Sequence, residues 1–236
     1  MNNCSGNSKF LAQGLSGDGE MGFAKPGSHG ITVAVVQYPN SSHLDEFGAL
    51  ENSPGVHVVW ARSQAAMAGL SASDWILLPG SSAISSDLAW LRSSGLDYCV
   101  NAHASLGGAV LGICGGAQML AEALIDPHSI DGNAAGLGLL SVVTCIEQNQ
   151  SAQAGPVQFD RISGRWAALS NLTVLGREIC YRQTSLRADM AAAGDGAVPV
   201  MPQGLAWQNT RGNVLGVYLH GLFENRGVLQ ALALAQ

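Results

Sequence analysis

Apolar residues in the first half of the chain form short β-branched runs, and each run is followed by a segment with helical spacing. The runs are typical of strands buried on both faces: ITVAVVQYP (31–39), GVHVVWA (55–61), DWILLPG (74–80) and AVLGI (109–113). The helical segments are SSDLAWLRSSG (85–95), LDYCVNAHASLGG (96–108) and GAQMLAEAL (116–124). This alternation predicts a mostly parallel, doubly wound α/β sheet with flanking helices.

The second half of the chain is richer in strand signals, which predicts an elaborated, partly antiparallel C-terminal portion of the same sheet. The predicted strands are GLGLLSVVTCI (136–146), LTVLGREICY (172–181), GLAWQ (204–208) and GNVLGVYLHGLF (212–223). RGVLQALALA (226–235) predicts a closing helix. For the first helix, we expect Ser85 or Ser86 to cap the start and Gly95 to cap the end.

Residues 1–30 differ from the rest because they combine seven glycines with few large apolar residues. We interpret them as a flexible leader or linker remnant, and residues 31–236 as one domain. The leader contains GDGEMG, which matches G-x-G-x-x-G. With no strand before it and no helical pattern after it, this match does not indicate a dinucleotide site.

Composition narrows the classes of function. The chain is 47% hydrophobic and 12% charged, so it can bury a large core. The net charge of −6 and the scattered basic residues argue against nucleic-acid binding. No apolar stretch is long enough for a membrane span, and no signal peptide is visible. Five unevenly spaced cysteines are typical of a reducing compartment, so we expect a cytoplasmic protein.

One cysteine stands where an apolar strand meets a predicted helix, in LGICGGAQML (111–120). Glycines at 112, 115 and 116 would permit a tight turn that holds Cys114 above the sheet. The first N–H groups of the following helix would stabilise a thiolate or an oxyanion there. A small buried cysteine at a strand end is the alternative. The glycines favour a nucleophile, and we expect Cys99 and Cys145, in apolar runs, to be buried.

A thiol nucleophile needs a base, and His220 is the histidine best placed to serve. It ends the run VLGVYL and precedes Gly221, whereas the other five histidines lie in loops, a strand interior or a helix. In a parallel sheet the carboxyl ends of the strands surround the ligand crevice, so Cys114 and His220 are expected to meet. LLPGSS (77–82) ends a strand similarly, and the N–H of Gly80 or Ser81 is a candidate oxyanion donor.

Together these segments resemble the triad-type glutamine amidotransferase domain, and most closely the glutaminase half of the cobyric acid synthase family of cobalamin biosynthesis. The resemblance spans roughly residues 31–234. Four segments carry it, in order: WILLPGSSAISSDLAWLR, GAVLGICGGAQML, GLGLL and GNVLGVYLHGLFEN. The cysteine turn alone is typical of the superfamily, whereas SDLAWLR and YLHGLF indicate the cobyric and cobyrinic amide-forming branch.

The resemblance implies a role for each matching residue. Cys114 would attack the side-chain amide of glutamine, and His220 would take the thiol proton and protonate the departing ammonia. The N–H groups of Gly80 and Gly115 would form the oxyanion hole. Gln118, with Ser81, would line the glutamine pocket. The ammonia would pass to an ATP-activated carboxylate of a corrinoid.

The resemblance also shows two departures. The third acid of the triad stands two residues after the histidine in many relatives, but Leu222 occupies that position here. In GREICYRQT (176–184), Cys180 replaces a histidine and Arg182 a glycine of the family pattern G-Y-E-I-H-M-G-R-T. This segment lies near the glutamine pocket in relatives, so Cys180 and Arg182 are candidate pocket residues. We expect Arg182 to obstruct glutamine.

The ATP-binding half of such enzymes has no counterpart in this sequence, because no G-x-x-x-x-G-K-[ST] motif occurs. We therefore expect no cofactor and no metal in this chain, and ATP and Mg²⁺ only in a separate synthetase domain or subunit that acts as partner.

Three functions remain open from the sequence. The first is a glutaminase component that feeds ammonia to the synthetase. The second is a scaffold or binding subunit that keeps the fold with impaired catalysis, and the third is a cysteine hydrolase of another amide. The Cys114, His220 and Gln118 set favours the first, and the altered 180–183 segment favours the second.

Overall fold

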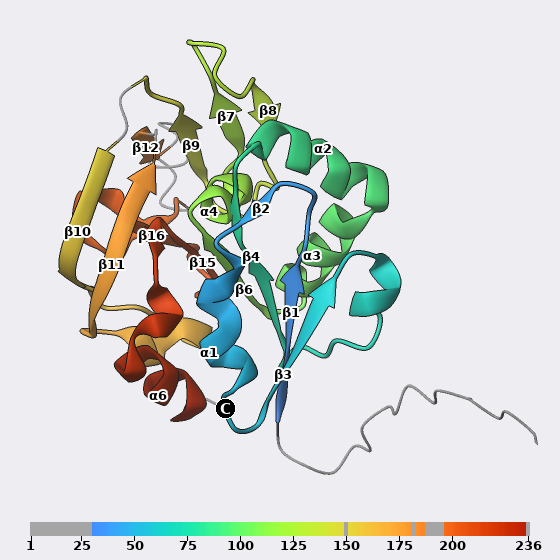
Figure 1. Cartoon of the computed structure of the whole chain (residues 1–236), viewed down its shortest axis with the longest axis vertical. Coiled ribbons are helices and arrows are strands. Elements are labelled where there is room, and N and C mark those ends of the chain that lie inside the picture. Colours follow the sequence, from blue (N-terminus) through green and yellow to red (C-terminus); the bar gives the residue numbers. More distant parts are fainter. Residues whose placement is uncertain (1–29, 149–150, 181–182, 187–195, 235–236) are drawn as a thin grey trace, which may run out of the picture.

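The four strands predicted in the first half of the chain lie side by side in one seven-stranded sheet (Figure 1). The structure is a computed structural model that describes residues 30–148, 151–180, 183–186 and 196–234, so the predicted leader lies outside it except for Gly30. In spatial order the strands are β13 (Val198–Pro199), β14 (Ala206–Gln208), β15 (Val214–Val217), β6 (Ala109–Ile113), β4 (Trp75–Leu78), β1 (Ile31–Val36) and β3 (Val56–Ala61).

The pairing within this sheet confirms the predicted fold class. The five strands from β15 to β3 are parallel to their neighbours, and β13, β14 and β15 pair antiparallel. β4 and β6 are buried along their whole length, as expected of central strands covered on both faces.

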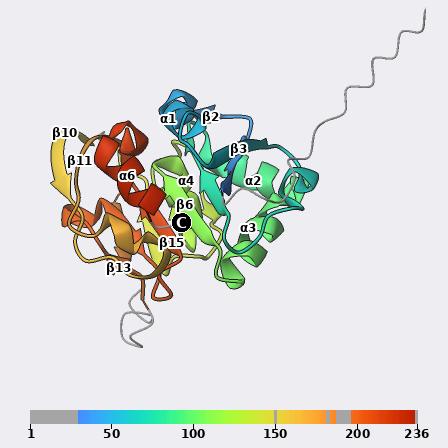
Figure 2. The same ribbon diagram turned by 90° about the horizontal axis from the view of Figure 1, so that it is seen from below.

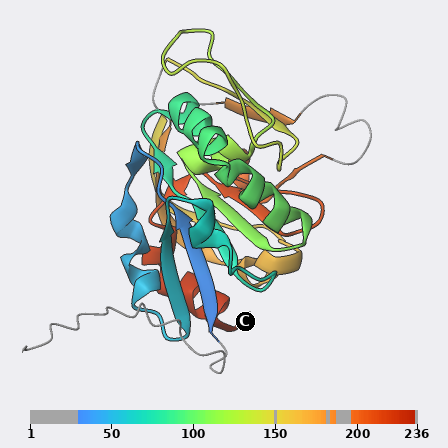
Figure 3. The same cartoon turned by 90° about the vertical axis from the view of Figure 1, so that its right-hand side faces the viewer.

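Helices cover both faces of the sheet. α2 (Ile84–Ser94) and α3 (Leu96–Ser105) lie along one face (Figure 3). α1 (Gly48–Glu51) and α6 (Arg226–Leu234) lie on the other side (Figure 2). The short α4 (Gly115–Leu120) follows β6. This covering buries the apolar side chains of the strands, which is the main source of stability in such a sheet.

Three smaller sheets lie beside the large one, and two of them consist of strands after Leu120, where the sequence predicted further strands. They are β10 (Ser151–Gln158), β11 (Thr173–Cys180) and β16 (Leu219–His220); β12 (Gln183–Leu186), β9 (Val142–Cys145), β7 (Ala123–Ile125) and β8 (Ala134–Ala135); and the pair β2 (Ser41–Ser42) and β5 (Gly80–Ser81). Short 3-10 helices lie between the strands and helices of the described chain: η1 (Leu44–Phe47), η2 (Gln64–Met67), η3 (Gly164–Leu169), η4 (Pro202–Gly204) and η5 (Leu222–Glu224).

Several predicted boundaries were wrong. The helix expected over 116–124 ends at Leu120, because the chain turns there into β7 and pairs with β9. The strand expected over 136–146 is reduced to β9, and β10 was not predicted at all. In both cases pairing with a distant strand overrides local propensity.

The start of α2 is capped from another loop, so the prediction of a cap by Ser85 or Ser86 was wrong. Asp131 Oδ2 accepts hydrogen bonds from the N–H groups of Ile84 (2.8 Å) and Ser85 (3.1 Å). The expected end is confirmed, because Gly95 adopts φ 71° at the C-cap. A cap of this kind stabilises a helix by about 1 kcal/mol.

None of the helices in the described part of the chain is both long and apolar enough to span a bilayer.

A buried histidine, His103, lies at the opposite edge of the sheet from Cys114, where β4 and β6 begin. His103 Nε2 lies 3.0 Å from the carbonyl oxygen of Asp74, and the side chain is 7% exposed. Burial, the largest effect, lowers the pKa of His103. Burial alone would raise the pKa of Asp74, but hydrogen bonds from Ser71 and Thr32 lower it.

We predict that His103 makes the folded protein sensitive to mild acid. Its folded pKa is depressed, so the unfolded chain binds the proton more readily. Stability is therefore lost as the pH falls through the unfolded value of about 6.5, by up to about 1.4 kcal/mol per pH unit. Urea unfolding at pH 7.5 and 5.5 should show a smaller loss for His103→Gln than for the parent. Equal losses in the two proteins would contradict this assignment.

Candidate active site

Cys114 occupies a strained turn between β6 and α4. It is the N-cap of the helix, with φ 49° and ψ −106°, a conformation that costs a residue other than glycine about 1–3 kcal/mol. A Cβ atom on Gly116 would lie 2.0 Å from the carbonyl oxygen of Leu78, so the turn packs directly against the end of β4. The cysteine side chain is 9% exposed. The packed turn places the thiol at the start of α4.

The segment Gly80–Ser81, which follows β4, packs against this turn. A Cβ atom on Gly115 would lie 2.6 Å from the backbone nitrogen of Ser81, so these two backbones touch. The Ser81 hydroxyl donates to Asp87 Oδ2 (2.6 Å) and accepts from the Ala83 N–H (3.1 Å). The side chain of Ser81 is thus engaged in holding its own loop, and it is the backbone of Ser81 that faces the turn.

Asp87 holds that loop through hydrogen bonds. Its carboxylate is fully buried, and its Oδ1 accepts hydrogen bonds from the Asn40 backbone N–H (3.1 Å) and side-chain amide (2.9 Å). Because a buried carboxylate is costly unless its oxygens are hydrogen-bonded, Asp87 ties the segments after β1 and β4 together.

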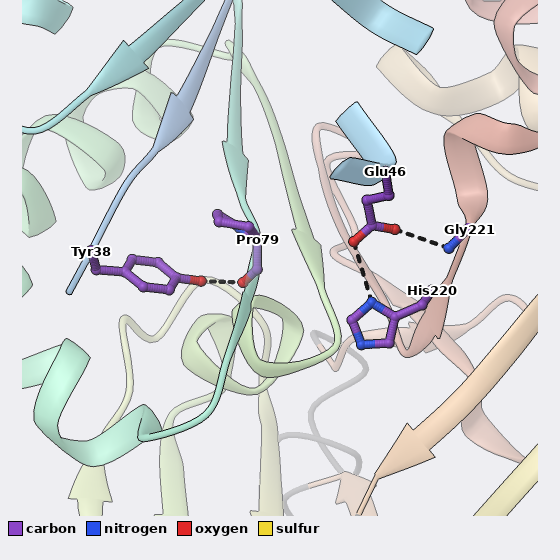
Figure 4. Close-up of polar contacts among 5 residues, drawn as sticks. All are labelled: Tyr38, Glu46, Pro79, His220 and Gly221. Atoms are coloured by element: carbon purple, nitrogen blue, oxygen red, sulfur yellow. Dashed lines mark hydrogen bonds and ion pairs between the residues drawn. The ribbon is translucent and has the colours of Figure 1, made fainter. Parts of the chain in front are cut away.

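Tyr38 is buried next to the same loop. Its hydroxyl donates to the carbonyl oxygen of Pro79 (Figure 4). Burial, followed by electrostatic repulsion from Asp87 and the acidic thiol group of Cys114, raises the pKa of Tyr38 well above its ordinary value. The phenol therefore stays protonated and acts as a donor that holds Pro79, and with it Gly80, in position.

His220 reaches the same edge of the sheet as Cys114. The N–H of Cys114 donates to the Val217 carbonyl oxygen (2.8 Å), because β15 pairs in parallel with β6. Three residues later the chain arrives at His220, which is 3% exposed. A Cβ atom on Gly80 would lie 3.1 Å from His220 Cε1, so the strand ends of Cys114, Gly80 and His220 gather at one point.

Glu46, which the sequence analysis did not single out, contacts His220 directly. Its Oε1 lies 3.2 Å from His220 Nδ1, and its Oε2 accepts the N–H of Gly221 at 2.9 Å (Figure 4). The side chain is 4% exposed. No local pattern indicates this contact, because Glu46 and His220 lie 174 positions apart. Glu46 stands beside Asp45 in HLDEF (43–47), and no pattern in this stretch separates the two acids.

Gln118 lies on α4, one turn after Cys114, and is 4% exposed. Its side-chain Oε1 is buried without a hydrogen-bond partner among the described residues. An unpaired buried oxygen costs roughly 1–3 kcal/mol, so a donor from a bound molecule would be favoured there.

The two departures in the 176–184 segment lie partly outside the described residues. Cys180 is the last residue of β11, and Arg182 is not described. The backbone of β11 pairs with β16, and Arg177 stands opposite His220. The strand that leads into the altered segment is therefore a neighbour of the candidate base.

Exposure of the remaining cysteines differs from expectation. Cys99 and Cys145 are partly exposed rather than buried, whereas Cys114 is buried. Cys99 lies on α3, whose outer face carries the exposed Tyr98, and this explains the error. Burial, followed by the charge of Asp97, raises the pKa of Cys99.

Known structures share this fold. A PurLQS structure from Thermotoga maritima superposes with a TM-score of 0.64, over 86% of this chain and 98% of the matched chain, at 16% identity. A crystal structure described as a glutamine amidotransferase gives a TM-score of 0.60 over the same shares, at 18% identity. At these identities the likeness supports the fold, which is that of class I glutamine amidotransferases.

Curated sequences are far more similar. The chain is 60% identical over 201 residues to a cobyric acid synthase of Polaromonas naphthalenivorans, which covers 85% of this chain and 41% of the relative. It is 57% identical over 201 residues to a cobyric acid synthase of Variovorax paradoxus, with the same coverage. The chain thus spans about two fifths of the length of these relatives.

The model of the CobB/CobQ-like glutamine amidotransferase domain matches residues 32–228, which include the turn at Cys114 and the strand of His220. The chain therefore belongs to the CobB/CobQ-like glutamine amidotransferase domain family, and its domain is like that of cobyric acid synthase.

Proposed function

We propose that this chain hydrolyses glutamine to glutamate and ammonia, with Cys114 as the nucleophile and His220 as the proton carrier. The observation that carries the proposal is the strained turn of Cys114 at the start of α4, placed at the sheet edge where His220 and Gly80 also arrive. Membership of the amidotransferase family supports glutamine as the substrate.

The first half of the reaction forms a thioester. His220 takes the proton of the Cys114 thiol, and the sulfur attacks the amide carbon of glutamine. The amide oxygen becomes an oxyanion that faces backbone N–H donors at Gly115 and at the Gly80–Ser81 strand end. Collapse of this intermediate breaks the C–N bond, and the proton held by His220 leaves with the nitrogen as ammonia.

The second half restores the enzyme. Water attacks the thioester carbon, and His220 accepts a proton from this water. The C–S bond breaks, glutamate leaves, and the proton returns to the sulfur of Cys114. We propose that the unpaired Oε1 of Gln118 accepts a hydrogen bond from glutamine in the pocket, because this contact would satisfy a buried acceptor.

The ammonia serves a synthetase domain or subunit in our proposal. The Polaromonas and Variovorax relatives are named cobyric acid synthase and are more than twice as long as the matched region. We propose that this partner holds ATP and Mg²⁺, and that it transfers the ammonia to an activated carboxylate of a corrinoid. In this arrangement the described chain supplies ammonia and needs no cofactor of its own.

We predict that a glutamine-mimicking electrophile labels Cys114 and spares Cys99. The raised pKa of Cys99 keeps that thiol protonated at neutral pH, so partial exposure alone does not make it reactive. Cys114→Ala should abolish both labelling and glutaminase turnover, whereas Cys99→Ala should change neither. Mass spectrometry of the labelled chain and release of ammonia are the measurements. Glutaminase activity of Cys114→Ala equal to that of the parent would refute the mechanism.

We also predict that the altered segment after β11 limits glutamine hydrolysis. Because this segment lies near the glutamine pocket in relatives, we expect an arginine in place of glycine to add bulk and a positive charge that repels the substrate's α-ammonium group. The double variant Cys180→His with Arg182→Gly should raise kcat/KM for glutamine by about tenfold or more, which corresponds to about 1.4 kcal/mol. An unchanged or lower kcat/KM, with the circular dichroism spectrum intact, would show that these residues are adapted to this chain's own substrate or partner.

A further inference from the structure

We propose that Glu46 is the positioning acid of His220, supplied from the N-terminal side of the chain in place of the acid that the family pattern puts two residues after the histidine. This inference rests on the proposed function, because it assigns a residue that prepares His220 for that reaction. It follows from the two hydrogen bonds of the Glu46 carboxylate and from the packing that holds η1 against η5.

The contact with Nδ1 fixes the proton on the imidazole. A carboxylate oxygen can only accept a hydrogen bond, so the 3.2 Å contact between Glu46 Oε1 and His220 Nδ1 places a proton on Nδ1. In a neutral imidazole the other nitrogen, Nε2, then carries a lone pair. Nε2 is thus the atom that can receive the proton of the Cys114 thiol.

The second oxygen of the same carboxylate fixes the backbone beside the ring. Glu46 Oε2 accepts the N–H of Gly221 at 2.9 Å, and Gly221 adopts φ 84°. Glu46 is therefore hydrogen-bonded both to the side chain of His220 and to the turn that follows it. A carboxylate held at two points has little freedom to rotate, and the orientation of the ring follows that of the carboxylate.

Aromatic packing brings Glu46 to this position. Phe47, the next residue, and Phe223, three residues after His220, are both fully buried, with ring centroids 5.8 Å apart. Such a pair contributes about 0.5–1.5 kcal/mol beyond the area that it buries. Because η1 and η5 are joined by this contact, the carboxylate and the imidazole approach each other from two rigid segments.

A second ring limits the motion of His220. The imidazole of His43 lies against it, with ring centroids 4.2 Å apart and an angle of 35° between the planes. His43 is itself held in the left-handed region, with φ 54°, at the start of η1. The segment His43–Phe47 thus contacts the face of the His220 ring as well as its Nδ1.

The other acidic candidate near His220 does not fit. Leu222 occupies the position two residues after the histidine and is fully buried. Glu224 approaches Gly221, since a Cβ atom there would lie 3.3 Å from its Oε2, but Glu224 is exposed. Within the described residues, Glu46 is the acid paired with His220.

The substitution Glu46→Gln tests the role with little change in volume. In glutamine an NH₂ donor replaces one of the two accepting oxygens, so the side chain cannot repeat both contacts, to the Gly221 N–H and to Nδ1–H, in the same orientation. Where its NH₂ group faces Nδ1, the ring must carry its proton on Nε2 and cannot take one from the thiol. The whole chain would be treated with the glutamine analogue 6-diazo-5-oxonorleucine, and the labelling of Cys114 would be followed over time by mass spectrometry.

We expect Glu46→Gln to lower the maximal labelling rate of Cys114 by about 10²-fold while the half-saturating analogue concentration changes by less than about threefold. Glu46→Asp, which keeps the charge, should recover at least about tenfold of that loss. Glu224→Gln, the matched loss of a nearby exposed carboxylate, should stay within about twofold of the parent. Circular dichroism and thermal unfolding confirm that each variant is folded.

The outcomes separate this inference from the proposed function. If the analogue does not label Cys114 of the parent, the proposed glutaminase mechanism fails, and the role of Glu46 fails with it. If the parent is labelled at Cys114 and folded Glu46→Gln is labelled within about threefold of the parent rate, only the positioning role is overturned. A loss in Glu46→Gln that Glu46→Asp does not relieve would also overturn it, because a purely steric effect would then explain the result.

Discussion

The parallel pairing of β15 with β6 is the contact on which the rest of the site depends. Val217 stands opposite Ile113, and the N–H of Cys114 donates to the Val217 carbonyl oxygen at 2.8 Å. This register carries the residue after β6 and the residues after β15 to the same edge of the sheet. A shift by one residue would turn the side chains to the opposite face and separate Cys114 from His220.

Buried carboxylates hold the loops around that edge. Asp87 binds Asn40 and Ser81, and Glu46 binds His220 and Gly221. Each carboxylate loses its hydration on folding, so it is stable only with hydrogen bonds in well-defined directions. The hydrogen bonds that make up for the lost hydration therefore hold the loops around Cys114 and His220 in place.

The relation to cobyric acid synthases gives this geometry its chemical setting. The chain matches their amidotransferase region at up to 60% identity and spans about two fifths of their length. In this family, the leucine at position 222 and the contact between Glu46 and His220 are to be considered together, because both concern the acid next to the histidine. The position two residues after His220 holds a leucine, and Glu46 of η1 contacts Nδ1 of His220, with the Phe47–Phe223 contact joining η1 to η5.

Local sequence patterns determined the main elements of the sheet and the placing of three residues at one edge of it, Cys114, His220 and Gly80. The β-branched runs predict β1, β3, β4 and β6 within a few residues, because these strands are buried on both faces and their apolar character is continuous. The glycines around Cys114 predict the turn, since the backbones of Leu78 and Ser81 leave no room for a Cβ atom there. The position of His220 at a strand end, and that of Gly80 after a Pro, follow from the same reasoning.

What the sequence did not reveal depends on contacts between distant segments. Asp131 caps α2 from 47 positions away, β7 forms where a helix was predicted, and Glu46 meets His220 across 174 positions. A carboxylate in the stretch HLDEF has no periodic or positional mark that separates it from the exposed Asp45 beside it. Only the packing of η1 against η5 decides which of the two acids is buried at the histidine, because burial and hydrogen-bond direction are properties of the folded chain.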